Sequence, residues 1–225
     1  MVPDALVDPR YKTAFRLFYT DKGLYIAAFM EQPKDTLVSR LSSRDQFINR
    51  DEFGITLDTS GEGLYGYWFV SNLGGSVMDG KVAPERQFSR EWDGPWLSAT
   101  AEVEGGWSTE MFLPWSMMTM ATVERGERKL GFWMMRKVAY LDERWSWPAL
   151  PFTSKRFMSA LPNMRTPDVQ PKQQVSFFPY VSAARNEITG EDDYRVGADV
   201  SWRPSSNLQV TAAINPDFGA VEFDD

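Results

Sequence analysis

Four of the nine tryptophans stand where an aromatic ring could bind a ligand. Trp68 and Trp133 each fall out of phase with the apolar residues around them, so each is expected to point away from the side that its strand buries. Trp92 and Trp96 flank a turn at residues 93–95. Sugars present flat C–H faces on which indole rings stack, so these rings are candidates for saccharide binding. Packing beneath loops is the alternative for each of them.

Arg50 and Glu110 are the polar side chains that could complete such a site. Arg50 precedes an acidic pair, and Glu110 is followed by three apolar residues on an expected strand. Two interpretations are open: a buried Arg50–Glu110 pair, or a polar floor that bonds sugar hydroxyls. Glycoside hydrolysis would need two carboxyl groups roughly 5–10 Å apart across the scissile bond. Nothing in the sequence places Glu110 opposite Asp58 or Asp93.

The chain contains no cysteine and no histidine. This excludes Ser-His-Asp and Cys-His nucleophiles as well as imidazole metal sites. A metal would need oxygen ligands, and calcium, which takes about six to eight of them, is the expected ion in a structural role. Asp58 and Asp79 lie beside the central hairpin and are its candidate ligands, with solvated turn carboxylates as the alternative.

One expected strand also carries Met134, Met135 and Lys137, and a Met/Lys pair can ligate haem iron. Methionines that fill a core are the favoured interpretation of this pattern.

The net charge of the chain limits the classes of ligand that it could bind. A net charge of -7 argues against a nucleic-acid partner, which needs a basic face. It is compatible with a neutral ligand or a cation.

Alternation of apolar residues predicts the elements that hold these side chains. Phe53 to Leu57 and Tyr65 to Phe69 alternate on either side of a glycine-rich turn, which predicts a hairpin. Further strands are expected at 14–19, 24–30, 97–103, 107–113 and 129–140, whereas 37–49 and 76–90 are expected to be irregular. The residues 116–121 are rich in methionine and are expected to fill the core. Short strands with regular turns predict an all-β fold, an antiparallel β-sandwich of jelly-roll type.

The order of short motifs in this region resembles the family 9 carbohydrate-binding module superfamily. The motifs are R-D-E-F at 50–53, L-D-T at 57–59, Y-G-Y-W-F at 65–69, N-L-G-G at 72–75, W-D-G-P-W at 92–96, G-W-S-T-E at 106–110 and L-P-W at 113–115. More narrowly, the chain resembles bacterial proteins that carry such a module ahead of an outer-membrane β-barrel. The likeness covers about residues 13–165, and N-P-D-F-G at 215–219 is similar to that family's early barrel region.

The resemblance implies a function and a location. It implies a noncatalytic periplasmic module that binds an oligosaccharide or polysaccharide at the outer membrane of a Gram-negative bacterium, in polysaccharide breakdown or uptake. It also implies structural calcium, because Asp58 and Asp79 match acidic positions of the family pattern. Two alternatives stay open: a glycoside hydrolase, and a non-sugar interaction or gating domain of an outer-membrane protein.

The chain is expected to divide into a sandwich at 1–165, a linker at 166–174 and a segment at 175–225. The linker carries two prolines among polar residues. Residues 194–202 and 208–214 alternate as two strands of transmembrane β-strand length, about 9–11 residues, which favours the first strands of a barrel. A soluble C-terminal β-hairpin that closes the sandwich is the alternative. Isolated barrel strands have unpaired edges, so this segment is expected to pack on the module or to form a homodimer.

Overall fold

The computed structural model describes residues 10–120, 127–151, 153–167, 169, 174–185, 192–205 and 208–215. Strands and single turns of 3-10 helix are the regular elements of these residues, which confirms the all-β prediction. The chain divides into two compact units, Met1–Pro171 and Lys172–Asp225. The described residues contain no helix that is long and apolar enough to cross a bilayer.

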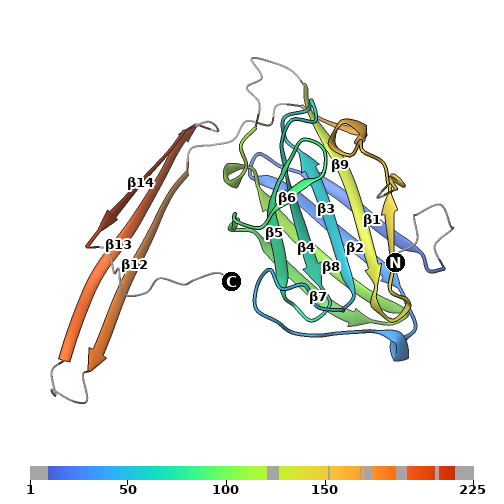
Figure 1. The fold of residues 1–225 in the computed structure, drawn as a ribbon, viewed down its shortest axis with the longest axis horizontal. Coiled ribbons are helices and arrows are strands. Elements are labelled where there is room, and N and C mark those ends of the chain that lie inside the picture. Colours follow the sequence, from blue (N-terminus) through green and yellow to red (C-terminus); the bar gives the residue numbers. More distant parts are fainter. Residues whose placement is uncertain are drawn as a thin grey trace. The chain divides into compact units, whose positions relative to one another are not determined.

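Two antiparallel sheets form the first unit, and Figure 1 shows the larger sheet lying over the smaller one. The smaller sheet has the order β1 (Thr13–Tyr19), β2 (Gly23–Glu31), β8 (Gly106–Pro114), β7 (Leu97–Val103). The larger sheet has the order β10 (Glu143–Trp147), β9 (Glu127–Val138), β3 (Glu52–Asp58), β4 (Gly66–Asn72), β5 (Val77–Ala83), β6 (Gln87–Ser89), with β11 (Asn163–Pro167) also on β9. The 3-10 turns are η1 (Lys34–Thr36), η2 (Trp115–Met117), η3 (Ala139–Leu141) and η4 (Met158–Ala160). The β-sandwich prediction is therefore confirmed.

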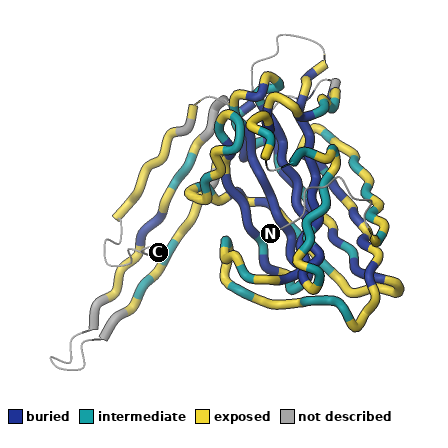
Figure 2. Tube along the Cα trace, turned by 45° about the vertical axis from the view of Figure 1, so that its right-hand side comes forward, coloured by how far each residue is buried: buried dark blue, intermediate teal, exposed yellow. Residues whose placement is uncertain are grey.

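The core lies between the two sheets, and period-two alternation decides which side chains enter it. Phe53 and Leu57 of β3 are fully buried and meet residues such as Trp107 of β8. Each such burial contributes about 1.5–3 kcal/mol. Met117 and Met118 belong to the same core, which confirms that the methionine-rich stretch fills it. The central strands of the larger sheet are buried along their whole length (Figure 2).

Residues 76–90 were predicted to be irregular, and this prediction is wrong, because they contain β5 and β6. Two residues of β5 interrupt the apolar alternation by which a strand is recognised in the sequence. Asp79 points into the interior, where an apolar residue would be expected, and is fully buried. Gly80 pairs with Trp68 on β4, and a Cβ at Gly80 would lie 2.8 Å from the indole Nε1. The indole therefore needs a glycine beside it, which interrupts the apolar alternation.

The sandwich extends beyond its predicted end at residue 165. Strand β11 pairs with β9 up to Pro167. Val169 is 3% exposed and belongs to the inter-sheet core, and its carbonyl accepts a bond of 3.1 Å from Arg128 Nε. Thr166, Pro167 and Val169 therefore belong to the sandwich, although they fall in the stretch that was predicted as a linker.

The second unit is a three-stranded antiparallel sheet with the order β12 (Gln174–Arg185), β13 (Asp192–Ser205), β14 (Leu208–Ile214). The two strands predicted at 194–202 and 208–214 are present, and β12 adds a third, so this unit is larger than a hairpin. Register aligns Val175, Trp202 and Val210 on one face. The same face carries Phe177, Val181, Val196 and Ile214, all exposed. One face of this sheet is therefore apolar within the unit.

Candidate functional site

The outer face of the larger sheet, which points away from the sandwich core, brings two predicted ligand residues together. Thr56 on β3 pairs with Trp68 on β4 and with Trp133 on β9. Directly paired residues point to the same face, and neighbouring strands lie about 4.8 Å apart, so the backbones of the two tryptophans lie roughly 10 Å apart on either side of Thr56. Both pack in a cluster separate from the core, as their phase predicted.

A pocket opens between the two indoles because the central strand is small there. Gly54 and Thr56 are the small outward residues in the middle of β3, whereas Val70 and Met135 beside Gly54 are large. The resulting pocket has a volume of about 300 Å³, at the lower end of ordinary ligand pockets. Its lining consists of Phe47, Glu52, Gly54, Ile55, Thr56, Trp68, Val70, Met78, Arg86, Phe88, Arg90, Trp133, Met135, Arg144 and Phe157.

Hydrogen bonds fix both indoles in place. Trp68 Nε1 donates to the carbonyl of Ser89 at 3.1 Å, and Trp133 Nε1 donates to the carbonyl of Pro148 at the same distance. Phe157 packs edge-on against Trp133 with centroids 5.1 Å apart. Since their N–H groups are already bonded to the protein, the two rings offer a ligand apolar surface only.

Arg50 is buried next to the pocket residue Glu52 and is not itself a lining residue. The side chain is fully buried, and its guanidinium donates to the carbonyls of Arg40 and Gln46 at 3.3 and 2.9 Å and to the hydroxyl of Ser42. Its Nε lies 3.9 Å from Oε1 of Glu52. Arg50 therefore ties the loop that carries Phe47 to β3.

Glu52 is a carboxyl group of the lining and is 3% exposed. Burial raises its pKa, while Lys137, Arg144 and Arg50 act in the opposite direction. Register places Glu52 beside Lys137. Its carboxylate thus lies among positive side chains at one end of the pocket.

Sequence analysis missed the three arginines of the lining, Arg86, Arg90 and Arg144. Arg86 and Arg90 lie in the stretch that was predicted to be irregular, so no face could be assigned to them. Arg144 belongs to β10, where it alternates with Trp145. That alternation was the available signal for an outward-facing arginine.

Trp92 and Trp96, by contrast, pack into the inter-sheet core. Their ring centroids lie 6.1 and 5.4 Å from that of Phe69, both in edge-on contacts. Neither is a lining residue of the pocket. The structure therefore places them in the packing alternative that the sequence left open.

Glu110 lies on the smaller sheet and does not meet Arg50. It pairs with Ala27 and Ala99 and is exposed on the outer face of that sheet, because the neighbouring Met111 points into the core. The acidic partner of Arg50 is Glu52 instead. A buried Arg50–Glu110 pair is thereby excluded.

Asp58 is committed to its own turn. Its carboxylate accepts the backbone N–H of Ser60 at 2.9 Å, of Gly61 at 3.1 Å and of Gly63 at 2.7 Å, together with the Ser60 hydroxyl. This is how a short acidic side chain closes a turn after a strand. The buried carboxylate already has four donors, so it is not arranged as a calcium ligand.

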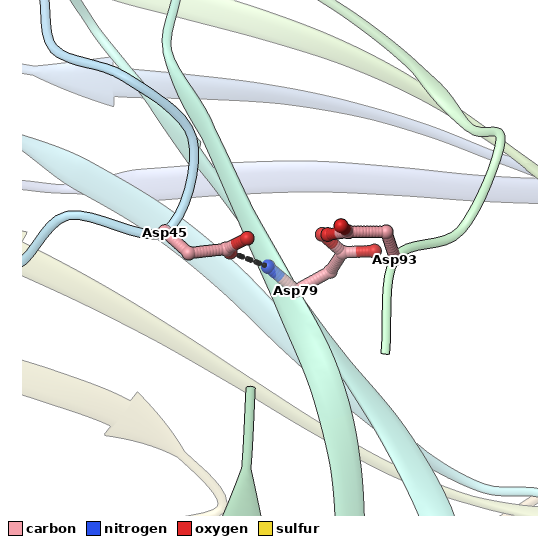
Figure 3. Close-up of side chains that lie close together, drawn as sticks. All are labelled: Asp45, Asp79 and Asp93. Carbon is pink, nitrogen blue, oxygen red and sulfur yellow. Dashed lines mark hydrogen bonds between the residues drawn. The ribbon is translucent and has the colours of Figure 1, made fainter. Parts of the chain in front are cut away.

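Asp79 belongs to an acidic cluster with Asp45 and Asp93 (Figure 3), in which one oxygen of each lies within 4.8 Å of the others. Arg44 supplies the positive charge among them: its guanidinium lies 2.5 Å from Asp79, 2.7 Å from Asp93 and 3.6 Å from Asp45. Asp79 also accepts the N–H of Gly94 at 2.7 Å. Calcium would have to displace Arg44 and find more oxygens, so these residues do not fit the ion in this arrangement.

Strand geometry also separates the candidate haem ligands. Met134 points into the inter-sheet core, whereas Met135 lies on the outer face and lines the pocket. Lys137 has the same parity as Met135 and pairs with Glu52. The two methionines therefore belong to opposite faces of the sheet.

No family model matches the chain, and no curated protein matches it. Among solved structures, a protein from Bacteroides uniformis described as a candidate carbohydrate-binding protein is similar to it with a TM-score of 0.56 and 13% identity, over 73% of this chain and 84% of that chain. The two chains share a fold. A family 9 carbohydrate-binding module from Caldicellulosiruptor kristjanssonii has a TM-score of 0.49 in two complexes. The module in the cellotriose complex is 13% identical to this chain, over 70% of this chain and 76% of that one. The module in the glucose complex is 12% identical, over 72% of this chain and 80% of that one.

Proposed function

We propose that the sandwich binds a saccharide in the outer-face pocket. The observation that carries this proposal is the pair of fixed indoles on either side of a small floor, with charged side chains around them. A sugar ring has apolar C–H faces that suit Trp68 and Trp133, and hydroxyl groups that suit Thr56 and the charged groups. A volume of about 300 Å³ suits a short saccharide or the end of a longer one.

Binding without cleavage is the activity that we propose. Hydrolysis requires two carboxyl groups roughly 5–10 Å apart, and Glu52 is the one carboxylic acid among the described lining residues. Incubation with saccharides whose reducing ends are blocked tests this directly. A binding protein releases no new reducing ends, whereas their release would identify a hydrolase.

The fold likeness to the Bacteroides uniformis protein also supports saccharide binding, since that protein is described as a candidate carbohydrate-binding protein. The first experiment is a titration of neutral and acidic saccharides, followed by tryptophan fluorescence and calorimetry. The neutral set comprises xylo-, cello- and malto-oligosaccharides. We expect at least one saccharide to bind and to change the fluorescence. A folded protein that binds none of them would reject the proposal.

Gly54→Val locates the site. A Cβ at Gly54 would lie 2.9 Å from Val70 Cγ2, 3.0 Å from Met135 Cε and 3.1 Å from the Phe69 carbonyl oxygen, so a larger side chain fills the floor of the pocket and shifts these neighbours slightly. Valine suits a strand, and the variant should fold. Ala27→Val, on the exposed outer face of the smaller sheet, is the matched control. We expect Gly54→Val to abolish binding and Ala27→Val to retain it.

We also propose that the chain works in the periplasm at the outer membrane, with the second unit next to lipid or to further strands. The apolar face made by Val175, Phe177, Trp202 and Val210 supports this proposal, as do strands of 12 and 14 residues. Transmembrane β-strands need about 9–11 residues. Fractionation of a Gram-negative cell that expresses the protein from its own gene tests the location. Recovery in the cytosol alone would reject it.

A further inference from the structure

The pocket is positively charged although the whole chain is acidic. Three guanidinium groups line it, against one carboxyl group, Glu52, while the chain carries a net charge of -7. A concave site lined by one sign of charge attracts ligands of the opposite sign.

Glu52 does not cancel the charge at the mouth of the pocket, because it has positive neighbours of its own. It pairs in register with Lys137, which in turn pairs with Arg144. Nε of Arg50 lies 3.9 Å from Oε1 of Glu52. The single carboxyl group is thus surrounded by cations at one end of the pocket.

Arg86 and Arg90 are oriented by neutral acceptors and by aromatic rings. Arg86 donates to the carbonyls of Ser154 and Pro151 at 3.1 and 2.8 Å, and its guanidinium lies 4.7 Å from the Phe157 ring centroid. Arg90 donates to the carbonyl of Asp45 at 3.2 Å, and its guanidinium lies 5.0 Å from the centroid of Phe47. These contacts fix the direction of each guanidinium group.

We propose that the saccharide bound here is acidic, with a ring carboxylate as in a uronic acid. The carboxylate is bound by Arg86 and Arg90, while the sugar ring lies between Trp68 and Trp133. Guanidinium groups recognise carboxylates through paired N–H donors, which fixes the orientation of the ligand as well as its charge. This inference rests on the proposed saccharide site and specifies its ligand class.

Matched sugar pairs test the inference. Galacturonate is compared with galactose, and glucuronate with glucose, by calorimetry at neutral pH. Each pair differs in one carboxylate. A charge-assisted hydrogen bond is roughly twice as strong as a neutral one, so we expect the uronate of one pair to bind at least about tenfold more tightly. Its affinity should fall as salt is added, because ions screen the attraction at an open pocket.

The substitution Arg90→Gln tests whether Arg90 causes the preference for the uronate. We expect the variant to lose the uronate preference and its salt dependence. Arg16→Gln, on exposed β1 of the smaller sheet, is the control and should leave both unchanged. The salt dependence of the native chain supplies the same test if Arg90→Gln fails to fold.

The outcomes separate the two proposals. Neutral sugars that bind as tightly as uronates overturn the acidic ligand and leave saccharide binding in place. Uronate preference that survives in folded Arg90→Gln also overturns the inference. Failure of every sugar to bind overturns the saccharide site itself, and this inference with it.

Discussion

Asp45→Asn should stabilise the sandwich at neutral pH and should not do so in acid. Burial, together with the nearby carboxylates of Asp79 and Asp93, raises the pKa of Asp45 from 3.8 to about 6, against the opposing effects of the hydrogen bond from Asp79 N–H and of Arg44. The folded chain therefore holds a proton at Asp45 that the unfolded chain has released. Asp45 contributes stability that is fully present below about pH 3.8 and is lost as the pH rises through about 6.

Asparagine removes the charge and keeps the local structure. Its Oδ1 can still accept the N–H of Asp79, a bond of 2.9 Å in the native chain. It also tolerates the left-handed backbone of this position, where φ is 60°. A pKa shift of about two units corresponds to about 3 kcal/mol. The Asp45 side chain is 20% exposed and contacts Arg44, so screening and the lost contact reduce the expected gain to about 1–2 kcal/mol.

Thermal unfolding followed by circular dichroism measures this gain. At about pH 7.5 we expect the variant to melt about 3–6 °C above the native chain, and at about pH 4 the two should melt together. Asp35→Asn, on the exposed η1, is the control and should leave the melting temperature unchanged at both pH values. A variant that shifts melting equally at both pH values, or that is less stable at neutral pH, would refute the reasoning.

Three further predictions follow from the same packing. Arg44→Gln should destabilise the sandwich by about 1–3 kcal/mol in urea unfolding, since it leaves three carboxylates without their cation, and an unchanged midpoint would contradict the role of Arg44. A chelator or added calcium should shift the melting temperature of the native chain by less than about 1 °C, because Arg44 already supplies the positive charge beside Asp79. A clear drop in melting temperature with the chelator would instead support structural calcium. A chain that ends at Pro171 should melt at the same temperature as the sandwich of the full chain. A chain that ends at Arg165 lacks the buried Val169, so its free energy of unfolding should be lower by about 1.5–3 kcal/mol. Equal stability of the two truncated chains would place the end of the sandwich at or before residue 165.

Local alternation was enough to predict most of the sandwich. Phe53 and Leu57 alternate with polar or small residues, and the side of the strand that they share is the buried one. The same rule placed Trp68 and Trp133 on the opposite face before any partner strand was known. These predictions succeed because the face of a strand residue depends on parity alone, which the chain carries locally.

Tertiary structure alone decided which side chains meet. Trp92 and Trp96 looked as suitable for a ligand as Trp68, but their loop folds them against Phe69 in the core. Asp58 and Asp79 looked equivalent as metal ligands, and each is satisfied by donors that only the folded chain brings to it. Short motifs do not contain these distances.

The charge of the pocket also came from the tertiary structure. Arg86 reaches the carbonyl of Pro151, which lies 65 residues further along the chain, and Arg144 arrives from the other edge of the sheet. No local pattern relates these arginines to Trp68 and Trp133. A sequence records the parity of each strand, whereas the order of strands in a sheet depends on the summed packing of residues that are distant along the chain. That order is what gathers two indoles and three guanidinium groups around Thr56.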